Sequence, residues 1–233
     1  MKFVKITGGV FRATRRGVNV YLWVQETEAL VFDTGEPGFA RPLARALDRC
    51  PLVRAILLTH CHYDHAGSAA ALSKDLDVPV FASGDDAALL RQGAWRRNSV
   101  PSPTVLGHVL TRLVARRYPE HIDPIERLEP LASLNTALGV EIETLSLPGH
   151  CAGQVAYCLP LDRERRAWIV GDVIMTIAGL REPILYEDRA VGLASIRKLA
   201  GKVQPGDVIC PGHGPELLVT RKVIDRLERL ARG

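Results

Sequence analysis

The sequence contains no apolar run close to the roughly 18 residues that a membrane-spanning helix requires. Lys2 and Lys5 place charges where a secretory signal peptide would have its apolar core, so export is not expected. Cysteine is scarce and scattered, with no Cys-x-x-Cys pair: Cys50, Cys61, Cys151, Cys158 and Cys210. An odd number of separated cysteines argues against a disulfide framework and favours a reducing compartment, the cytoplasm.

Low-complexity stretches are also missing, and aromatic residues make up only 6% of the chain. The 233 residues are 47% hydrophobic and 24% charged, a balance typical of a globular protein with a sizeable core. The net charge is only +4, and 24 of the 30 basic residues are arginine. An excess this small does not indicate a nucleic-acid partner, and we expect none.

Short apolar runs alternate with stretches of helical spacing along most of the chain. Strands are expected at 18–24, 29–32, 54–58, 78–82, 140–147, 154–159, 167–170 and 207–210. Helices are expected at 38–49, 68–76, 190–201 and from about 216 to the C-terminus. This order predicts one α/β domain over 1–233, with two β-rich layers, helices outside them, and a helical insertion at about 84–138.

Three histidines and an aspartate are packed into six positions directly after the strand expected at 54–58. They are His60, His62, Asp64 and His65. Imidazole and carboxylate side chains together suit zinc, iron or manganese. On a loop at a strand end, His60 and His62 can point to one side while Asp64 and His65 turn to another. This one segment can therefore serve two metal ions.

Further candidate ligands stand where other expected strands end at a glycine. They are His150, Asp172 and His213. Loops at strand ends along one edge of a scaffold are where active sites are commonly assembled. Five of the seven histidines fall in this pattern. His108 and His121 do not, and we interpret both as ordinary structural or surface residues.

The ordered set, His-x-His-x-Asp-His followed by His, Asp and His, resembles the metallo-β-lactamase-fold hydrolases over most of the chain, from Asp33 to His213. The resemblance implies an αββα four-layer sandwich with a two-metal site on one edge. By position, it assigns His60, His62 and His150 to the first metal. Asp64, His65 and His213 are assigned to the second, with Asp172 bridging both. Asp33 matches an aspartate that orients ligands in this fold.

The implied chemistry is hydrolysis of a small-molecule carboxylic ester, lactone or thioester by a hydroxide that bridges two divalent ions. Zinc is the expected metal, with iron or manganese as alternatives. Asp64 faces the nucleophile in this arrangement and is the expected proton-handling residue. The aspartate at position 172 disfavours antibiotic hydrolysis. A relict, non-enzymatic domain is disfavoured because no ligand is missing.

Several branches of the family stay open. Pro148-Gly149-His150 and Tyr157 resemble the glyoxalase II-like thioesterases, whereas Cys151 and Gln154 depart from their pattern. Lactonases carry a tyrosine soon after the bridging aspartate. Here Met175 stands near that place, and Tyr186 is the nearest tyrosine and a candidate substrate contact. A mononuclear iron dioxygenase of the persulfide dioxygenase type is also open, as is a phosphodiesterase or nuclease.

Residues 91–117 carry six arginines and no acidic residue. Val105, Leu106, Val109, Leu110, Leu113 and Val114 recur there at helical spacing and predict one apolar helix face. This helix could pack on the core, form a homodimer contact, or act as a lid beside the metal site. In the lid interpretation, Arg96 and Arg97 attract an anionic or acyl-bearing substrate.

Overall fold

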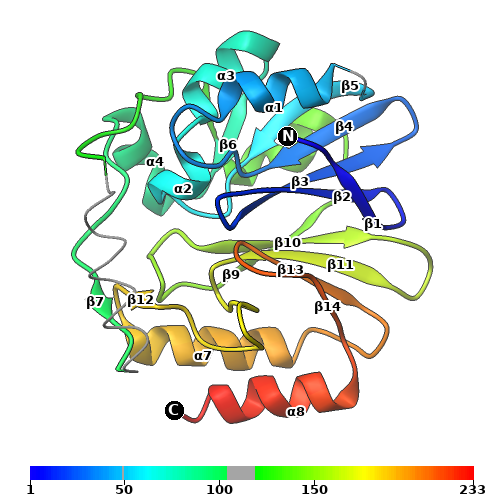
Figure 1. Cartoon of the computed structure of the whole chain (residues 1–233), viewed down its shortest axis with the longest axis vertical. Coiled ribbons are helices and arrows are strands. Elements are labelled where there is room, and N and C mark those ends of the chain that lie inside the picture. The colour runs from blue at the N-terminus through cyan, green and yellow to red at the C-terminus, as the bar shows by residue number, and fades with distance from the viewer. Residues whose placement is uncertain (49, 104–118) are drawn as a thin grey trace.

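The protein folds as two facing β-sheets with helices on both outer faces (Figure 1). The computed structural model describes residues 1–48, 50–103 and 119–233. Helices α1 (Ala40–Leu47) and α3 (Ala69–Leu76) cover one sheet, and α7 (Arg189–Ala200) and α8 (Arg221–Leu230) cover the other. The expected αββα sandwich is therefore confirmed. Among the described residues, no helix is both long enough and apolar enough to span a bilayer.

The first sheet has seven strands in the order β1-β2-β3-β4-β5-β6-β8. An antiparallel meander comes first: β1 (Val4–Thr7), β2 (Val10–Arg15), β3 (Val18–Gln25) and β4 (Glu28–Phe32). The remaining strands run parallel to β4: β5 (Leu52–Leu57), β6 (Val80–Ala82) and β8 (Leu128–Pro130). The register pairs Phe32 with Leu57. The chain therefore leaves β4 and β5 at the same edge, which brings Asp33 beside the Thr59–His60 segment.

The second sheet has five strands in the order β14-β13-β11-β10-β9. Their bounds are β9 (Glu143–Ser146), β10 (Val155–Pro160), β11 (Arg166–Gly171), β13 (Val208–Pro211) and β14 (Leu217–Leu218). Strands β11 and β13 are parallel, and Gly171 pairs with Pro211. Asp172 and the Gly212–His213 pair therefore emerge side by side.

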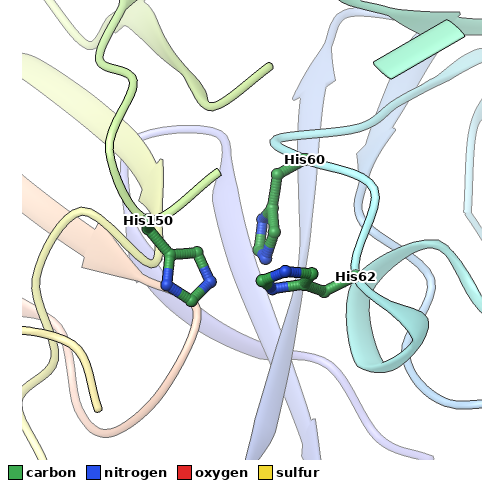
Figure 2. A group of neighbouring side chains, drawn as sticks. All are labelled: His60, His62 and His150. Atoms are coloured by element: carbon green, nitrogen blue, oxygen red, sulfur yellow. The ribbon is translucent and has the colours of Figure 1, made fainter. Parts of the chain in front are cut away.

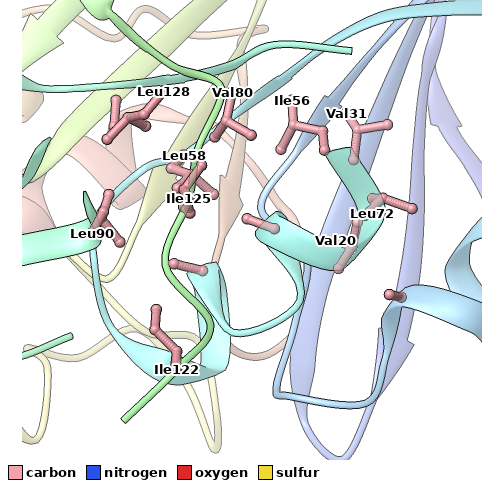
Figure 3. Packing of buried hydrophobic residues seen from close by; sticks show 14 of the residues in the cluster. Val20, Val31, Ile56, Leu58, Leu72, Val80, Leu90, Ile122, Ile125 and Leu128 are labelled. Atoms are coloured by element: carbon pink, nitrogen blue, oxygen red, sulfur yellow. The ribbon is translucent and has the colours of Figure 1, made fainter. Parts of the chain in front are cut away.

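Buried side chains form three apolar layers. Phe32, Leu57, Tyr157 and Ile169 fill the space between the sheets. Because successive strand residues face opposite ways, Ile56 and Val80 point outward and pack with Leu72 of α3 (Figure 3). On the other side, Trp168 and Ile209 pack under α7 and α8, which contribute Ile196 and Leu227. Apolar burial on both faces of each sheet thus holds the strand ends in place.

The described part of the segment at 84–138, which excludes residues 104–118, contains strands as well as helices. It consists of α4 (Gly84–Arg91), β7 (Val100–Pro101), β8, a 3-10 turn at Leu131–Ser133 and α6 (Leu134–Leu138). Strand β8 pairs with β6 in the seven-stranded sheet, and β7 pairs with β12 (Leu185–Tyr186). Residues 104–118, which include His108 and the expected apolar helix face, lie outside the described residues.

The expected strands between 18 and 32 and between 154 and 170 are present almost as predicted, because their apolar runs are fully buried. Strands β1, β2, β7, β8, β12 and β14 were not predicted. The last helix begins at Arg221 and not near 216. Strand β14 occupies Leu217–Leu218, and the Thr220 side chain then caps the helix by accepting from the Val223 N–H.

Candidate metal centre

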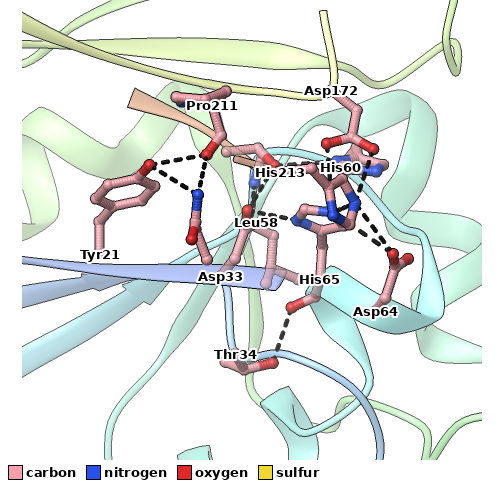
Figure 4. A network of polar contacts seen from close by, with 12 residues as sticks. Tyr21, Asp33, Thr34, Leu58, His60, Asp64, His65, Asp172, Pro211 and His213 are labelled. Atoms are coloured by element: carbon pink, nitrogen blue, oxygen red, sulfur yellow. Dashed lines mark hydrogen bonds and ion pairs between the residues drawn. The ribbon is translucent and has the colours of Figure 1, made fainter. Parts of the chain in front are cut away.

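All seven residues that the sequence singles out as ligands meet at one edge of the sandwich, where strands of both sheets end (Figures 2 and 4). His60 and His62 follow β5, and Asp64 and His65 lie on the short helix α2 (Tyr63–Ala66). His150 lies between β9 and β10, Asp172 follows β11 and His213 follows β13. Five of them are buried, and Asp64 and His213 are partly exposed.

One group consists of His60, His62 and His150. Their candidate ligand nitrogens lie within 4.8 Å of one another, and Figure 2 shows the three rings turned toward a common point. The ring centroids are 4.5 to 5.0 Å apart. The Nε2 atoms of His60 and His150 are buried without a hydrogen-bond partner among the described residues. Burying a polar atom unpaired is costly, so these nitrogens point to a ligand between them.

A second group consists of Asp64, His65 and His213. Asp64 Oδ2 lies 3.3 Å from His213 Nε2 and 3.9 Å from His65 Nε2, and the two Nε2 atoms are 3.4 Å apart. The donor atoms of this group also lie within 4.8 Å of one another.

The carboxylate of Asp172 lies between the two groups. Its Oδ2 is 3.6 Å from His150 Nε2 and 3.3 Å from His213 Nε2, and its Oδ1 is 3.5 Å from His65 Nε2. The residue is 3% exposed, and its Oδ1 has no hydrogen-bond partner in the described part of the chain. Asp172 therefore faces members of both groups at once.

Hydrogen bonds on the outer side of the rings fix their orientation. The Nδ1 of His150 donates to the carbonyl of Leu185, and that of His213 donates to the carbonyl of Gly17, both at 2.9 Å. A carbonyl can only accept, so Nδ1 carries the proton in both rings and Nε2 faces the centre.

Asp33 performs the same task for His65. Its buried carboxylate accepts from His65 Nδ1, from the Thr59 N–H and from the Thr59 hydroxyl, all at 2.8 Å. Because the Thr59 hydroxyl donates to Asp33, its oxygen is left to accept from His60 Nδ1 at 3.0 Å. Asp33 has a φ of 59°, a left-handed conformation that costs energy for a residue other than glycine. These contacts are those that an orienting role requires.

The electrostatics of the two groups differ. Burial, reinforced by neighbouring imidazoles, lowers the pKa of His60 and brings that of His62 to about 3. Burial also acts to lower the pKa of His65, but Asp172, Asp64 and Asp33 outweigh it and raise the value to about 9. The pKa of His213 is raised in the same way: burial opposes the shift and Asp172 dominates the favourable contacts.

The two carboxylates are held in their charged form. Burial disfavours this, yet His65 and His213 bring the pKa of Asp64 to about 2, and His213 and His65 lower that of Asp172. The first group thus offers uncharged nitrogens, whereas the second is held together by imidazolium–carboxylate attraction. Nitrogen and oxygen donors without thiolate, in two clusters that share an acid, fit divalent metal ions.

Three supporting residues were not anticipated from the sequence. Asn19, in β3, donates its side-chain N–H groups to the carbonyls of Pro211 and Gly214 and holds the segment that carries His213. The amide nitrogen of Gln154 lies 3.4 Å from the Thr59 carbonyl and 3.2 Å from that of Val170. The signal that could have revealed the role of Asn19 is its position as a lone polar residue inside an apolar strand.

Gly212 is the third. A Cβ at this position would lie 2.3 Å from Asp172 Oδ1 and 2.5 Å from His65 Cε1. Only a residue without a side chain fits between these two neighbours.

The candidate substrate contacts are already engaged within the protein. Tyr186 is 1% exposed, and its hydroxyl lies 3.2 Å from Glu182. Arg97 pairs with Asp86 and Glu187, and Arg96 is exposed with its guanidinium 4.8 Å from the centroid of the Trp95 ring. Contact of these residues with a substrate stays a prediction. His121 is 70% exposed, as expected for a residue outside the centre.

Comparison with known proteins supports the same relationship. Residues 13–230 match the family model of the metallo-beta-lactamase superfamily. The chain is 26% identical to "Probable metallo-hydrolase YqgX" of Bacillus subtilis, covering 85% of each chain. It is 24% identical to "Hydroxyacylglutathione hydrolase GloC" of Haemophilus influenzae, covering 83% of each.

Among solved structures, the protein TTHA1623 in a di-iron-bound form is similar, with a TM-score of 0.55 and 25% identity over 86% of this chain and 88% of that one. The family match extends over nearly the whole described sandwich and includes every residue of the centre. The chain therefore belongs to the metallo-beta-lactamase superfamily.

Proposed function

We propose that the protein is a hydrolase with a binuclear metal centre that cleaves a carboxylic ester, a lactone or a thioester. The position of the Asp172 carboxylate carries this proposal, because it lies within 3.3 to 3.6 Å of histidines from both ligand groups. A single carboxylate in that place can bridge two divalent ions and offset the repulsion between them.

In this proposal His60, His62 and His150 hold one ion, and Asp64, His65 and His213 hold the other. The unpaired buried Nε2 atoms of His60 and His150 support the first assignment. Imidazole and carboxylate ligands suit zinc, which we favour. Iron is the alternative supported by the di-iron form of TTHA1623, and manganese accepts similar ligands.

The two ions, when bound, would lower the pKa of coordinated water and polarise the oxygen of the reacting group. The protein orients the ligands through Asp33, Leu185 and Gly17, as described above. We assign proton transfer to Asp64. Its side chain is 20% exposed, more than the side chains of the other candidate ligands.

An acyl substrate is supported by the relative named as a hydroxyacylglutathione hydrolase. Glutathione itself is not part of the proposal, because Cys151 and Gln154 replace the residues that the thioesterase resemblance leads us to expect. Both are buried, and the polar groups of both contact other parts of the protein. We propose a small molecule with an ester, lactone or thioester bond.

Elemental analysis of the purified protein, followed by assays on lactones, thioesters, aryl esters and phosphodiesters, tests the proposal. We expect two metal ions per chain and hydrolysis of one of the first three classes. His62→Ala and Asp172→Ala should lower metal content and abolish hydrolysis. His121→Ala is the matched control, since this histidine is 70% exposed and lies outside the centre.

Full activity after treatment with a strong chelator would refute the metal-dependent reaction. One iron per chain without hydrolysis would favour a persulfide dioxygenase. Activity on phosphodiesters alone would favour a phosphodiesterase or nuclease.

A further inference from the structure

The first ligand group is assembled from two separate loops that belong to different sheets. Residues 58–62, the His60–His62 loop, follow β5 of the seven-stranded sheet. Residues 147–154, the His150 loop, connect β9 and β10 of the five-stranded sheet. Any relative movement of the sheets would therefore change the spacing of the three rings.

The buried carboxylate of Asp86, in the first turn of α4, contacts both loops. Its Oδ2 accepts the backbone N–H of Cys61 at 2.9 Å, and Cys61 is the residue between His60 and His62. The same oxygen lies 3.7 Å from the Sγ of Cys151, which follows His150. Asp86 is 1% exposed, and a Cβ on Gly153 would lie 2.1 Å from its Cγ. The His150 loop therefore packs closely against the Asp86 carboxylate.

Arg97 supplies the positive charge that a buried carboxylate requires. Its Nη1 donates to Asp86 Oδ1 at 3.0 Å and lies 3.5 Å from Glu187 Oε1, an ion-pair contact. Its Nη2 also donates to the carbonyl of Asp85. Because the Arg97 guanidinium is paired with both Asp86 and Glu187, it is well suited to a structural task.

Glu187 extends the network along the His150 loop. Its Oε2 accepts the N–H of Ala152 at 2.8 Å. Its own N–H lies 2.9 Å from the carbonyl of Gly149 and 3.2 Å from that of His150. The chain Asp86–Arg97–Glu187 therefore connects the residue between His60 and His62 with the residues on both sides of His150.

We propose that Asp86, Arg97 and Glu187 form a clamp of positioning residues that sets the spacing between the His60–His62 loop and the His150 loop, and thereby tunes metal affinity at the first ligand group. The proposal rests on the proposed binuclear centre and gives Arg97 a task other than substrate binding. Other contacts, such as Val155 N–H to the Thr59 carbonyl at 2.9 Å, join the base of the loops. The side chains of the clamp instead contact Cys61, Cys151 and Ala152, which lie next to the ligands in the chain.

The test compares Asp86→Asn, Arg97→Lys and Glu187→Gln with the wild-type protein. Asp86→Asn is nearly isosteric and keeps one acceptor oxygen, so the fold is expected to persist. Arg165→Ala is the matched control because it removes an exposed arginine–aspartate pair with Asp162, in the turn between β10 and β11. Zinc affinities at the two ligand groups are measured by competition with a chromophoric chelator, and cobalt spectra report the ligand geometry.

Outer contacts of metal ligands typically contribute about 10- to 100-fold to affinity or activity. We expect Asp86→Asn to weaken zinc binding at the first group by this amount and to leave the second group unchanged. Arg97→Lys keeps the charge and should have a smaller effect. In the metal-free protein, amide hydrogen exchange at Cys61 and Ala152 should become faster in Asp86→Asn and in Glu187→Gln, respectively.

Unchanged affinity at both groups would overturn the clamp, as would an equal loss at both groups that follows a lower melting temperature. A higher KM for anionic substrates in Arg97→Lys with unchanged zinc affinity would also overturn it, in favour of a substrate contact. If the wild-type protein binds no metal, the proposed function fails. The exchange rates at Cys61 and Ala152 still report on the clamp in that case.

Discussion

The substitution Gly212→Ala tests the placement of the centre most directly. Gly212 lies between the end of β13 and His213, against Asp172 and His65. The added Cβ would lie 2.3 Å from Asp172 Oδ1 and 2.5 Å from His65 Cε1, whereas ordinary contacts begin at 3.4 Å. From these differences, Asp172 must move by about 1.1 Å and His65 by about 0.9 Å relative to residue 212.

Neither Asp172 nor His65 can move by this distance without changing the geometry of the candidate ligands. His65 is held by Asp33 at 2.8 Å, and Asp172 is the carboxylate that both ligand groups share. Metal–ligand distances are normally kept within about 0.2 Å, so a displacement near 1 Å is several times too large. We expect metal affinity to fall at both groups and hydrolysis to drop by about 100-fold or more.

The fold itself should survive this substitution. Overfilling a packed site costs about 1–3 kcal/mol, compared with a total stability of roughly 5–15 kcal/mol for a typical domain. For a chain of this size, the melting temperature should fall by about 2–12 °C. Calorimetry of the metal-free protein and elemental analysis after dialysis measure the two effects separately.

Gly84→Ala is the matched control. A Cβ there meets no atom within 4 Å, and Gly84 is the first residue of α4. It should leave metal content, activity and melting temperature close to wild type. A folded Gly212→Ala protein that binds two ions with wild-type affinity would refute the reasoning.

Three further predictions concern protonation. A metal ion that binds the Asp64–His65–His213 group must displace the proton of His65, whose pKa is about 9. The affinity of this group for the ion should therefore rise about tenfold per pH unit, for each proton displaced, up to about pH 9. His62 has a pKa of about 3, so an ion that binds it displaces no proton near neutral pH. Equal pH slopes for the two equivalents in zinc titrations at pH 6, 7 and 8 would contradict this. In the metal-free protein, the raised pKa of His65 contributes stability that is complete below pH 6.5 and is lost as the pH rises toward 9. The lowered pKa of His62 has the opposite effect, because stability falls as the pH drops from 6.5 toward 3. Urea midpoints should therefore be highest near pH 6.5, and a midpoint that increases steadily from pH 5 to 8.5 would rule this out. Burial raises the pKa of Cys158 to about 12. At pH 8, Ellman's reagent should therefore react with only the partly exposed Cys50 in the native protein and with all five thiols in denaturant. Rapid reaction of Cys158 in the folded protein would contradict its burial.

The sequence was sufficient to select the seven candidate ligands that the fold brings together, because its signals are local. His60, His62, Asp64 and His65 are adjacent in the chain, and each distant ligand follows an apolar strand that stops at a glycine. Apolar runs long enough to be buried also predicted the central strands, since burial on both faces leaves no polar alternation to interpret. Short strands such as β7 and β14, each of two residues, carry no such signal.

The roles of Asn19, Asp86, Arg97 and Gly212 could be read only from the tertiary structure. Arg97 stands in a basic stretch, for which the sequence left open a helix packed on the core, a dimer contact and a lid that attracts an anionic substrate. The fold instead places Asp86 and Glu187, 11 positions before it and 90 positions after it, against its guanidinium. Pairing of this kind depends on which strand ends meet across the two sheets, and that is decided by the packing of the buried apolar faces. Composition and periodicity record which residues will be buried, but not which distant charges that burial brings into contact.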